Sequence, residues 1–170
     1  MEVLIRYAKH DDYSQIINIL NQAIRSKKST GYLNEFTSES RKDWFQFHKN
    51  EKYPILVAEL NNEISGWISL SPYRKERKAF ERTAEVSFFI HQDYQRKGLG
   101  TKLLLEMMNV AKRLGFSSMF AIVLEINTAS IKLLKTNNFK KWGYLPGVAE
   151  IECETISHMY YGIKIKKNLA

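Results

Sequence analysis

Two glycines in a basic segment are the first residues of this chain that suggest chemistry. Gly98 and Gly100 lie in residues 95–101, after the apolar run 86–90 and before the amphipathic run 101–114. A strand, a glycine loop and a helix in this order predict a cradle for a diphosphate, because the loop amides and the positive end of the helix dipole point at the anion. A glycine pair alone more often marks an ordinary turn. The prediction therefore depends on the flanking elements.

Two better-known phosphate loops do not match this segment. The dinucleotide fingerprint needs a third glycine where this chain has Leu103, and the P-loop needs a lysine where it has Thr101. The remaining pattern, Q-x-x-G-x-G, resembles the pyrophosphate loop of the GNAT acetyltransferase superfamily. Residues 127–139 are similar to the N-x-x-S-x-x-L…G-F signature of the same superfamily, with Asn138 in the usual glycine position.

Glu85 is the candidate general base. It lies within the otherwise apolar, strand-like run 83–90, where an unpaired carboxylate is costly and burial would raise its pKa. Acetylation of an amine needs such a group, since amines are mostly protonated at neutral pH. The alternative is a carboxylate paired with a neighbour such as Arg74 or Arg77.

Residues 67–101 resemble the phosphinothricin acetyltransferase-like branch of GNAT, which there has an aromatic-plus-arginine loop, R-x-A-Y and T-V-E-x-S-V-Y-V. In that branch the glutamate is the catalytic base, and the arginine loop helps to hold the carboxylate of an amino-acid-like substrate. The resemblance thus implies Glu85 as the base, with a solvated basic loop as the alternative role for the cations. The implied substrate-binding residues are Tyr73, Arg74, Lys75, Arg77 and Glu85.

The resemblance implies acetyl-CoA as co-substrate. No metal is expected, because none of the four histidines is arranged to bind one and the chain has a single cysteine. In GNAT proteins the strand before the loop separates from its neighbour, and its free backbone binds the pantetheine arm. Asn127 would otherwise cap a helix, and Ser130 would otherwise be a surface residue. The implied cofactor-binding residues are Phe88, Phe89, Ile90, Gln95, Arg96, Lys97, Gly98, Leu99, Gly100, Thr101, Asn127 and Ser130.

Three features depart from the branch. Leu134 occupies the position where relatives have a tyrosine or histidine, so the thiolate must leave unaided, through water, or with another donor such as Tyr144. Phe80 stands where the branch commonly has tyrosine. Residues 143–152 lack the branch's glycine-Trp-x-Asp run and resemble less characterised GNAT relatives instead.

The periodicity predicts strands at 3–7, 55–60, 64–70, 83–90, 116–124, 139–145 and 156–165. One helix is expected to begin after an N-cap at Asp11, and three more are expected at 41–49, 101–114 and 129–136. Gly115 is the expected C-cap of the helix at 101–114. Residues 26–37 are expected to form a loop over the substrate side. The expected fold class is α/β: the GNAT acyl-CoA N-acyltransferase fold, a mixed, mostly antiparallel sheet with helices on both faces. We expect one domain over residues 1–170.

Composition narrows the function classes. The net charge of +8 indicates a solvated basic surface, a nucleic-acid binder, or a field that attracts the phosphates of coenzyme A. The single Cys153 excludes an internal disulfide, and the four histidines are given no role. Apolar stretches are too short for a membrane helix, and charges at Glu2 and Arg6 speak against a signal peptide. A cytoplasmic protein is the expectation.

The leading hypothesis is an acetyl-CoA-dependent N-acetyltransferase that acts on a small, amino-acid-like amine by direct transfer. The alternative, suggested by Leu134 and the altered C-terminal region, is a non-catalytic acyl-CoA-binding module. A nucleic-acid binder that shares the fold comes third. The expected partner is a small-molecule amine, with no nucleic acid and no membrane. A homodimer stays open, since relatives in this branch are commonly dimers and Tyr160 and Tyr161 would serve either a partner surface or the core.

Overall fold

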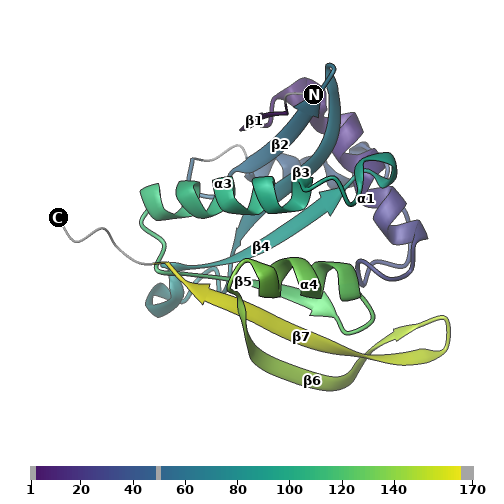
Figure 1. Cartoon of the computed structure of the whole chain (residues 1–170), viewed down its shortest axis with the longest axis vertical. Coiled ribbons are helices and arrows are strands. Elements are labelled where there is room, and N and C mark those ends of the chain that lie inside the picture. Colours follow the sequence, from purple (N-terminus) through teal and green to yellow (C-terminus); the bar gives the residue numbers. More distant parts are fainter. Residues whose placement is uncertain (1–2, 49–50, 166–170) are drawn as a thin grey trace.

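The computed structural model describes residues 3–48 and 51–165. Its strands form one sheet in the order β1-β2-β3-β4-β5-β7-β6 (Figure 1). Only β4 and β5 are parallel, and every other neighbouring pair is antiparallel, which confirms the expected mixed sheet. The strands are β1 (Leu4–Tyr7), β2 (Ile55–Leu60), β3 (Glu63–Pro72), β4 (Thr83–Ile90), β5 (Ser118–Leu124), β6 (Lys140–Ile151) and β7 (Glu154–Lys164).

Helices pack on both faces of this sheet, as predicted. On one face lie α3 (Leu99–Arg113) and α4 (Thr128–Thr136), which share a core cluster with the inward residues of β2 to β5. On the other face lie α1 (Tyr13–Arg25) and α2 (Lys42–Phe47), which pack on β2 and β3. Figure 1 shows α3 and α4 in front of the sheet and α1 beyond it. The methionine-containing side of α3 is core, because Leu103, Leu104 and Met107 are fully buried.

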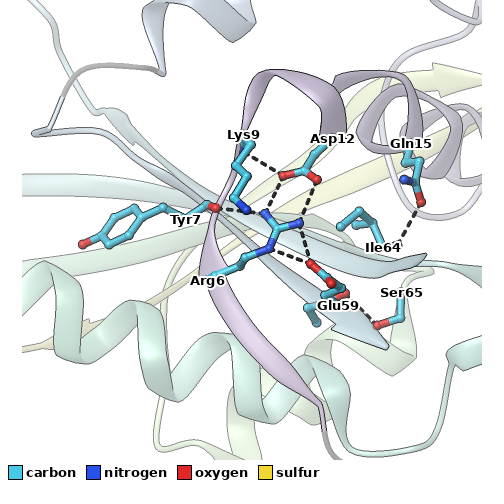
Figure 2. A network of polar contacts seen from close by, with 9 residues as sticks. Arg6, Tyr7, Lys9, Asp12, Gln15, Glu59, Ile64 and Ser65 are labelled. Atoms are coloured by element: carbon cyan, nitrogen blue, oxygen red, sulfur yellow. Dashed lines mark hydrogen bonds and ion pairs between the residues drawn. The ribbon is translucent and has the colours of Figure 1, made fainter. Parts of the chain in front are cut away.

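The start of α1 differs from the prediction. Asp11 does not cap it, because a 3₁₀ turn at His10–Asp12 comes first and the helix begins at Tyr13. The neighbouring Asp12 is buried, and its carboxylate accepts hydrogen bonds from the Arg6 guanidinium and from the Lys9 amide (Figure 2). A helix does begin in this region, but Asp11 is not its N-cap, and the neighbouring Asp12 forms an ion pair with Arg6.

The closing strands are longer than predicted. β6 continues to Ile151, and the turn to β7 is made by Glu152 and Cys153, whose φ angles are 52° and 67°. The predicted strand ended at Leu145, but β6 continues past Pro146 and Gly147, which lie between Leu145 and Ala149, where the register with β7 shifts. Because β6 is an edge strand, an irregularity there and a missing amide at Pro146 are tolerated.

The sheet opens between β4 and β5. These strands pair at only three positions, Thr83 with Ser118, Ala84 with Met119, and Glu85 with Phe120. Beyond Glu85, β4 continues beside β3 to Ile90 while β5 continues beside β7 to Leu124. The separation expected from the superfamily resemblance is therefore present, and it begins at Glu85.

The candidate active site

A cavity of about 390 Å³ lies on the α1 and α2 side of the sheet, next to this opening. Because alternate residues of a strand share a face, the sheet side of the cavity is lined by every second residue of β3, β4 and β5. The loop after α1 and residues near α2 complete the wall, so the predicted loop 26–37 does lie over the cavity. The lining residues that matter for the argument are Tyr32, Arg41, Trp44, Glu85, Ser87 and His158.

Glu85 is a half-buried carboxylate at the point where β4 and β5 separate. Within the described residues it makes no ion pair and no side-chain hydrogen bond, so the alternative pairing with Arg74 or Arg77 is not observed. Burial raises the pKa of this carboxyl above its usual range. A cavity carboxylate with a raised pKa and no partner has the properties of a general base.

The loop before α3 leaves a row of backbone donors without partners. In the part of the chain that the structure describes, no amide from Arg96 to Thr101 donates to a backbone carbonyl; Lys102 is the first to do so, to Gly98. The loop turns through φ angles of 58° at Arg96 and 79° at Gly98, and the Gln95 amide group bonds the Ile90 carbonyl at 3.3 Å. Free amides at the start of a long helix form an anion site.

Glycine is favoured at positions 98 and 100 of this loop for two different structural reasons. A Cβ at Gly98 would meet nothing within 4 Å, but its positive φ favours glycine. A Cβ at Gly100 would lie 2.4 Å from Cδ1 of Leu133, so glycine there lets α3 pack against α4. The Gly98 backbone is thus open to a ligand, whereas Gly100 serves packing as well.

The side chains predicted for cofactor binding have mixed surroundings. Lys97 bonds the Asp93 carbonyl at 2.9 Å, and Arg96 is exposed. Phe88 and Ile90 pack against the core beneath α3. Phe89 lines the cavity, and the centre of its ring lies 4.9 Å from that of Trp67. Their cofactor-binding role would thus belong to the backbone of β4.

Asn127 caps α4, because its Oδ1 accepts from the Ser130 amide at 3.1 Å. The capping alternative for Asn127 is therefore observed, and its contact with the pantetheine region stays a prediction. Asn138 has a φ of 67°, which explains why glycine is usual at this position and why asparagine can replace it.

The predicted substrate residues lie in the exposed segment between β3 and β4. Arg74, Lys75 and Arg77 are exposed and are absent from the cavity lining, and the Arg74 guanidinium lies 5.2 Å from the Tyr73 ring. Tyr73 itself is half-buried and packs 5.0 Å from Phe120, which is the register partner of Glu85. The structure thus brings Tyr73 near the base but leaves the three cations at the rim.

Sequence reasoning missed two ionisable groups of the cavity, Arg41 and His158. Burial lowers the pKa of His158, so this imidazole is mainly neutral at pH 7. It lies opposite Leu124 in the β5–β7 pairing. Period-two alternation places His158 and Tyr160 on one face of β7, but no local pattern says that β7 lies beside β5.

Neither Leu134 nor Tyr144 places a proton donor in the cavity. Leu134 is fully buried in the core beneath α3 and α4. The Tyr144 hydroxyl bonds Ser157 Oγ at 2.8 Å and Glu125 at 3.3 Å, and Tyr144 does not line the cavity. Hydrogen bonds from Ser157 lower the pKa of Glu125, which marks this group as a stabilised anion.

Two other kinds of site are not found in residues 3–48 and 51–165. No group of three or more histidine, cysteine, aspartate or glutamate side chains there is arranged to hold a metal ion. No helix there is both long enough and apolar enough to span a bilayer.

Known proteins share both the sequence pattern and the fold. The acetyltransferase (GNAT) family model matches residues 14–139. The chain is 36% identical over 149 residues to YwnH of Bacillus subtilis, named as a candidate phosphinothricin acetyltransferase, with 87% of this chain and 90% of YwnH covered. It is 31% identical over 144 residues to the L-amino acid N-acyltransferase MnaT of Escherichia coli, with 85% and 83% covered.

A solved structure extends the similarity to three dimensions. The candidate acetyltransferase yncA of Salmonella typhimurium, solved with its cofactor acetyl-CoA, superimposes with a TM-score of 0.91 at 27% identity. The superposition covers 99% of this chain and 96% of that one.

Proposed function

Because the chain belongs to the acetyltransferase (GNAT) family and to its phosphinothricin acetyltransferase-like branch, we propose that it acetylates an amino-acid-like amine with Glu85 as general base. It is an N-acetyltransferase whose co-substrate is acetyl-CoA. The observation that carries the proposal is the unpaired carboxylate of Glu85 in the cavity where β4 and β5 separate. The name of MnaT, an L-amino acid N-acyltransferase, supports the substrate class.

The cavity residues support a direct transfer. Glu85 accepts a proton from the substrate ammonium, and its raised pKa makes it a stronger proton acceptor than a solvated carboxylate. The neutral amine nitrogen then forms the bond to the acetyl carbon as the carbon–sulfur bond breaks. Acetyl-CoA supplies the activated thioester. The coenzyme A thiolate leaves with the sulfur electron pair, and the substrate nitrogen loses its second proton to solvent.

Two parts of the backbone would hold the co-substrate. The loop amides from Arg96 to Thr101 would bind the pyrophosphate, because they have no other hydrogen-bond partner in the described chain. The edge of β4 at Phe88, Phe89 and Ile90 would bind the pantetheine arm, because β5 has left it. Side-chain roles for Gln95, Lys97, Leu99, Asn127 and Ser130 stay predictions.

Release of the thiolate needs no side-chain acid in this proposal. A thiol with a pKa near 8.5 leaves at neutral pH at a cost of about 2 kcal/mol relative to assisted release. Leu134 is thus compatible with turnover.

A thiol-release assay with acetyl-CoA tests the proposal. The acceptor panel should contain amino acids, polyamines and simple alkylamines, and we expect turnover to be fastest with amino acids. Tight binding of coenzyme A by calorimetry without turnover on any amine would instead favour the non-catalytic acyl-CoA-binding module. Salt-sensitive binding to duplex DNA or RNA would favour the nucleic-acid alternative.

A homodimer, a cytoplasmic location and a single domain over residues 1–170 stay predictions. Tyr161 is buried in the core, whereas Tyr160 is half-buried and stacks on Phe120. The exposed aromatic residues of this region are Trp142 and Tyr144 on β6. Light scattering coupled to size exclusion measures the oligomeric state directly.

A further inference from the structure

We propose that Arg41 binds the carboxylate of the acceptor amino acid, an inference that rests on the proposed acetylation of an amino-acid-like substrate. Arg41 lies at the start of α2 and lines the same cavity as Glu85. The two groups come from opposite walls: Glu85 from the sheet, and Arg41 from the segments that cover it. One cavity thus offers a proton acceptor for an ammonium and a cation for a carboxylate.

Aromatic rings hold the Arg41 guanidinium in place. Its central carbon lies 5.2 Å from the ring centre of Tyr32, 4.6 Å from that of Phe36 and 4.9 Å from that of Trp44. Ring faces attract a cation, and planar guanidinium groups stack well on them. This packing fixes the side chain before any ligand arrives, which lowers the entropy cost of binding.

The same guanidinium lacks an anion. Within the described residues no carboxylate forms an ion pair with Arg41, and its Nε is buried without a hydrogen-bond partner. Aromatic faces attract charge but do not replace oxygen acceptors, and buried polar atoms in folded proteins are nearly always paired. A planar fork of N–H donors with no acceptor matches the two oxygens of a carboxylate.

Charge separation within the cavity agrees with this assignment. Arg41 and Glu85 do not pair with each other, so each keeps its charge available for the ligand. An ion pair between them would lower the pKa of Glu85 and weaken it as a base. Arg74 and Arg77 are exposed outside the cavity lining, where water would screen their interaction with a carboxylate.

Two acceptors that differ only in the carboxylate provide the test: leucine and 3-methylbutylamine. For Arg41→Gln we expect kcat/KM for leucine to fall about 10- to 100-fold, mainly through KM, because a charge-assisted hydrogen bond is lost. The value for 3-methylbutylamine should change less than about threefold. Arg74→Gln tests the rival assignment of the carboxylate to the segment before β4. Arg113→Gln, at an exposed arginine in the last turn of α3, is the matched control and should keep the wild-type preference.

Two results would overturn the assignment: a wild-type preference for leucine that survives in Arg41→Gln, or one that disappears in Arg74→Gln. Arg41→Lys serves if the glutamine variant does not fold, since it keeps the charge among the rings but loses the planar fork. It should raise KM for leucine alone. An unchanged KM in Arg41→Lys would also count against Arg41.

Failure of the proposed function looks different. If the wild-type protein acetylates no amino acid of the acceptor panel, acetylation of amino-acid-like amines is refuted, and calorimetry decides the role of Arg41. Leucine binding that is lost in Arg41→Gln would support the carboxylate site. Equal binding to both proteins, or none to the wild type, would refute it.

Discussion

Arg6 and Arg41 are both partly withdrawn from solvent, but their surroundings differ. The Arg6 guanidinium donates to Asp12 at 2.6 Å and 2.9 Å and to Glu59 at 2.6 Å, so that two carboxylates enclose it (Figure 2). The hydrogen bond to Asp12 raises the Arg6 pKa further above its usual value. Arg41 has aromatic rings in place of carboxylates, and Glu85 in the same cavity has no cation.

The pKa shifts of the two carboxyl groups show what this difference means. Desolvation acts to raise the pKa of Asp12, but hydrogen bonds from Arg6 and the Lys9 amide outweigh it, and the pKa is lowered. At Glu85 desolvation acts alone, and the pKa is raised. The first arrangement ties β1 and β2 to the turn before α1. The second leaves charges that only a ligand can satisfy, which is typical of a functional site.

The largest expected effect comes from removing the unpaired carboxylate. Glu85→Gln should lower kcat/KM for amino-acid acetylation about 10²- to 10⁴-fold, because the ammonium then has no positioned proton acceptor. The thiol-release assay measures this loss. Glu81→Gln alters an exposed residue ahead of β4 and should leave the rate unchanged. Full activity in Glu85→Gln would exclude this residue as the base.

Breaking the ion pair between Asp12 and Arg6 should lower the stability of the fold and leave the acetylation activity unchanged. Asp12→Asn leaves Arg6 without its bidentate partner, and we expect the free energy of unfolding to fall by about 2–4 kcal/mol. Denaturant titration measures the change, and acetylation at temperatures well below melting should persist. Asp11→Asn is the matched control, since that side chain is fully exposed, and it should change stability by less than about 0.5 kcal/mol. Equal effects of the two variants would contradict the distinction.

The two ends of α3 allow the same comparison for backbone groups. Gly98 and Gly115 have φ angles of 79° and 81°, and an added Cβ would meet nothing within 4 Å at either position. Alanine should therefore cost about 1 kcal/mol of folding stability at both. Only Gly98→Ala should also weaken binding of coenzyme A, about tenfold. An alanine at position 98 disfavours the positive φ angle, and a backbone that relaxes to a negative φ moves the free amides of residues 96–101 away from the phosphates. Calorimetric affinities that fall equally in both variants would argue against an anion site at residues 96–101.

The smallest expected effect is a gain in stability from the same change that removes activity. Since the folded state raises the Glu85 pKa, it binds more protons than the unfolded state, and wild-type stability falls as pH rises through the folded pKa. Glutamine cannot ionise. Glu85→Gln should thus melt a few degrees higher than wild type at pH 7 and equally at pH 4. A lower melting temperature at pH 7 would mean that a partner stabilises the ionised carboxylate.

Local patterns predicted much of the fold and part of the site. The alternation of apolar residues gave β4 at Thr83–Ile90, and the glycine loop and α3 followed within two residues of their expected positions. Glu85 stood out because it interrupts an apolar strand. These features depend on neighbours in sequence, so the sequence alone could identify them.

Other parts depend on contacts between distant segments. Whether Glu85 had a partner could not be read locally, because Arg74 and Arg77 are close in sequence but lie outside the cavity lining. Arg41 was missed because its role depends on Tyr32 and Trp44 closing over a strand more than forty residues later. The predicted N-cap at Asp11 was wrong, because no local signal shows that Arg6 will bind the neighbouring Asp12 and that a 3₁₀ turn will precede α1.

The division between β4 and β5 has a mechanical consequence. Only three residue pairs join β4 to β5, so the half-sheets β1 to β4 and β5 to β7 are held together mainly by the shared core beneath α3 and α4. A chain-like ligand that lies in the gap and bonds the exposed edge of β4 would add a second connection between them. We therefore expect the loaded protein to be more rigid at this gap than the empty one.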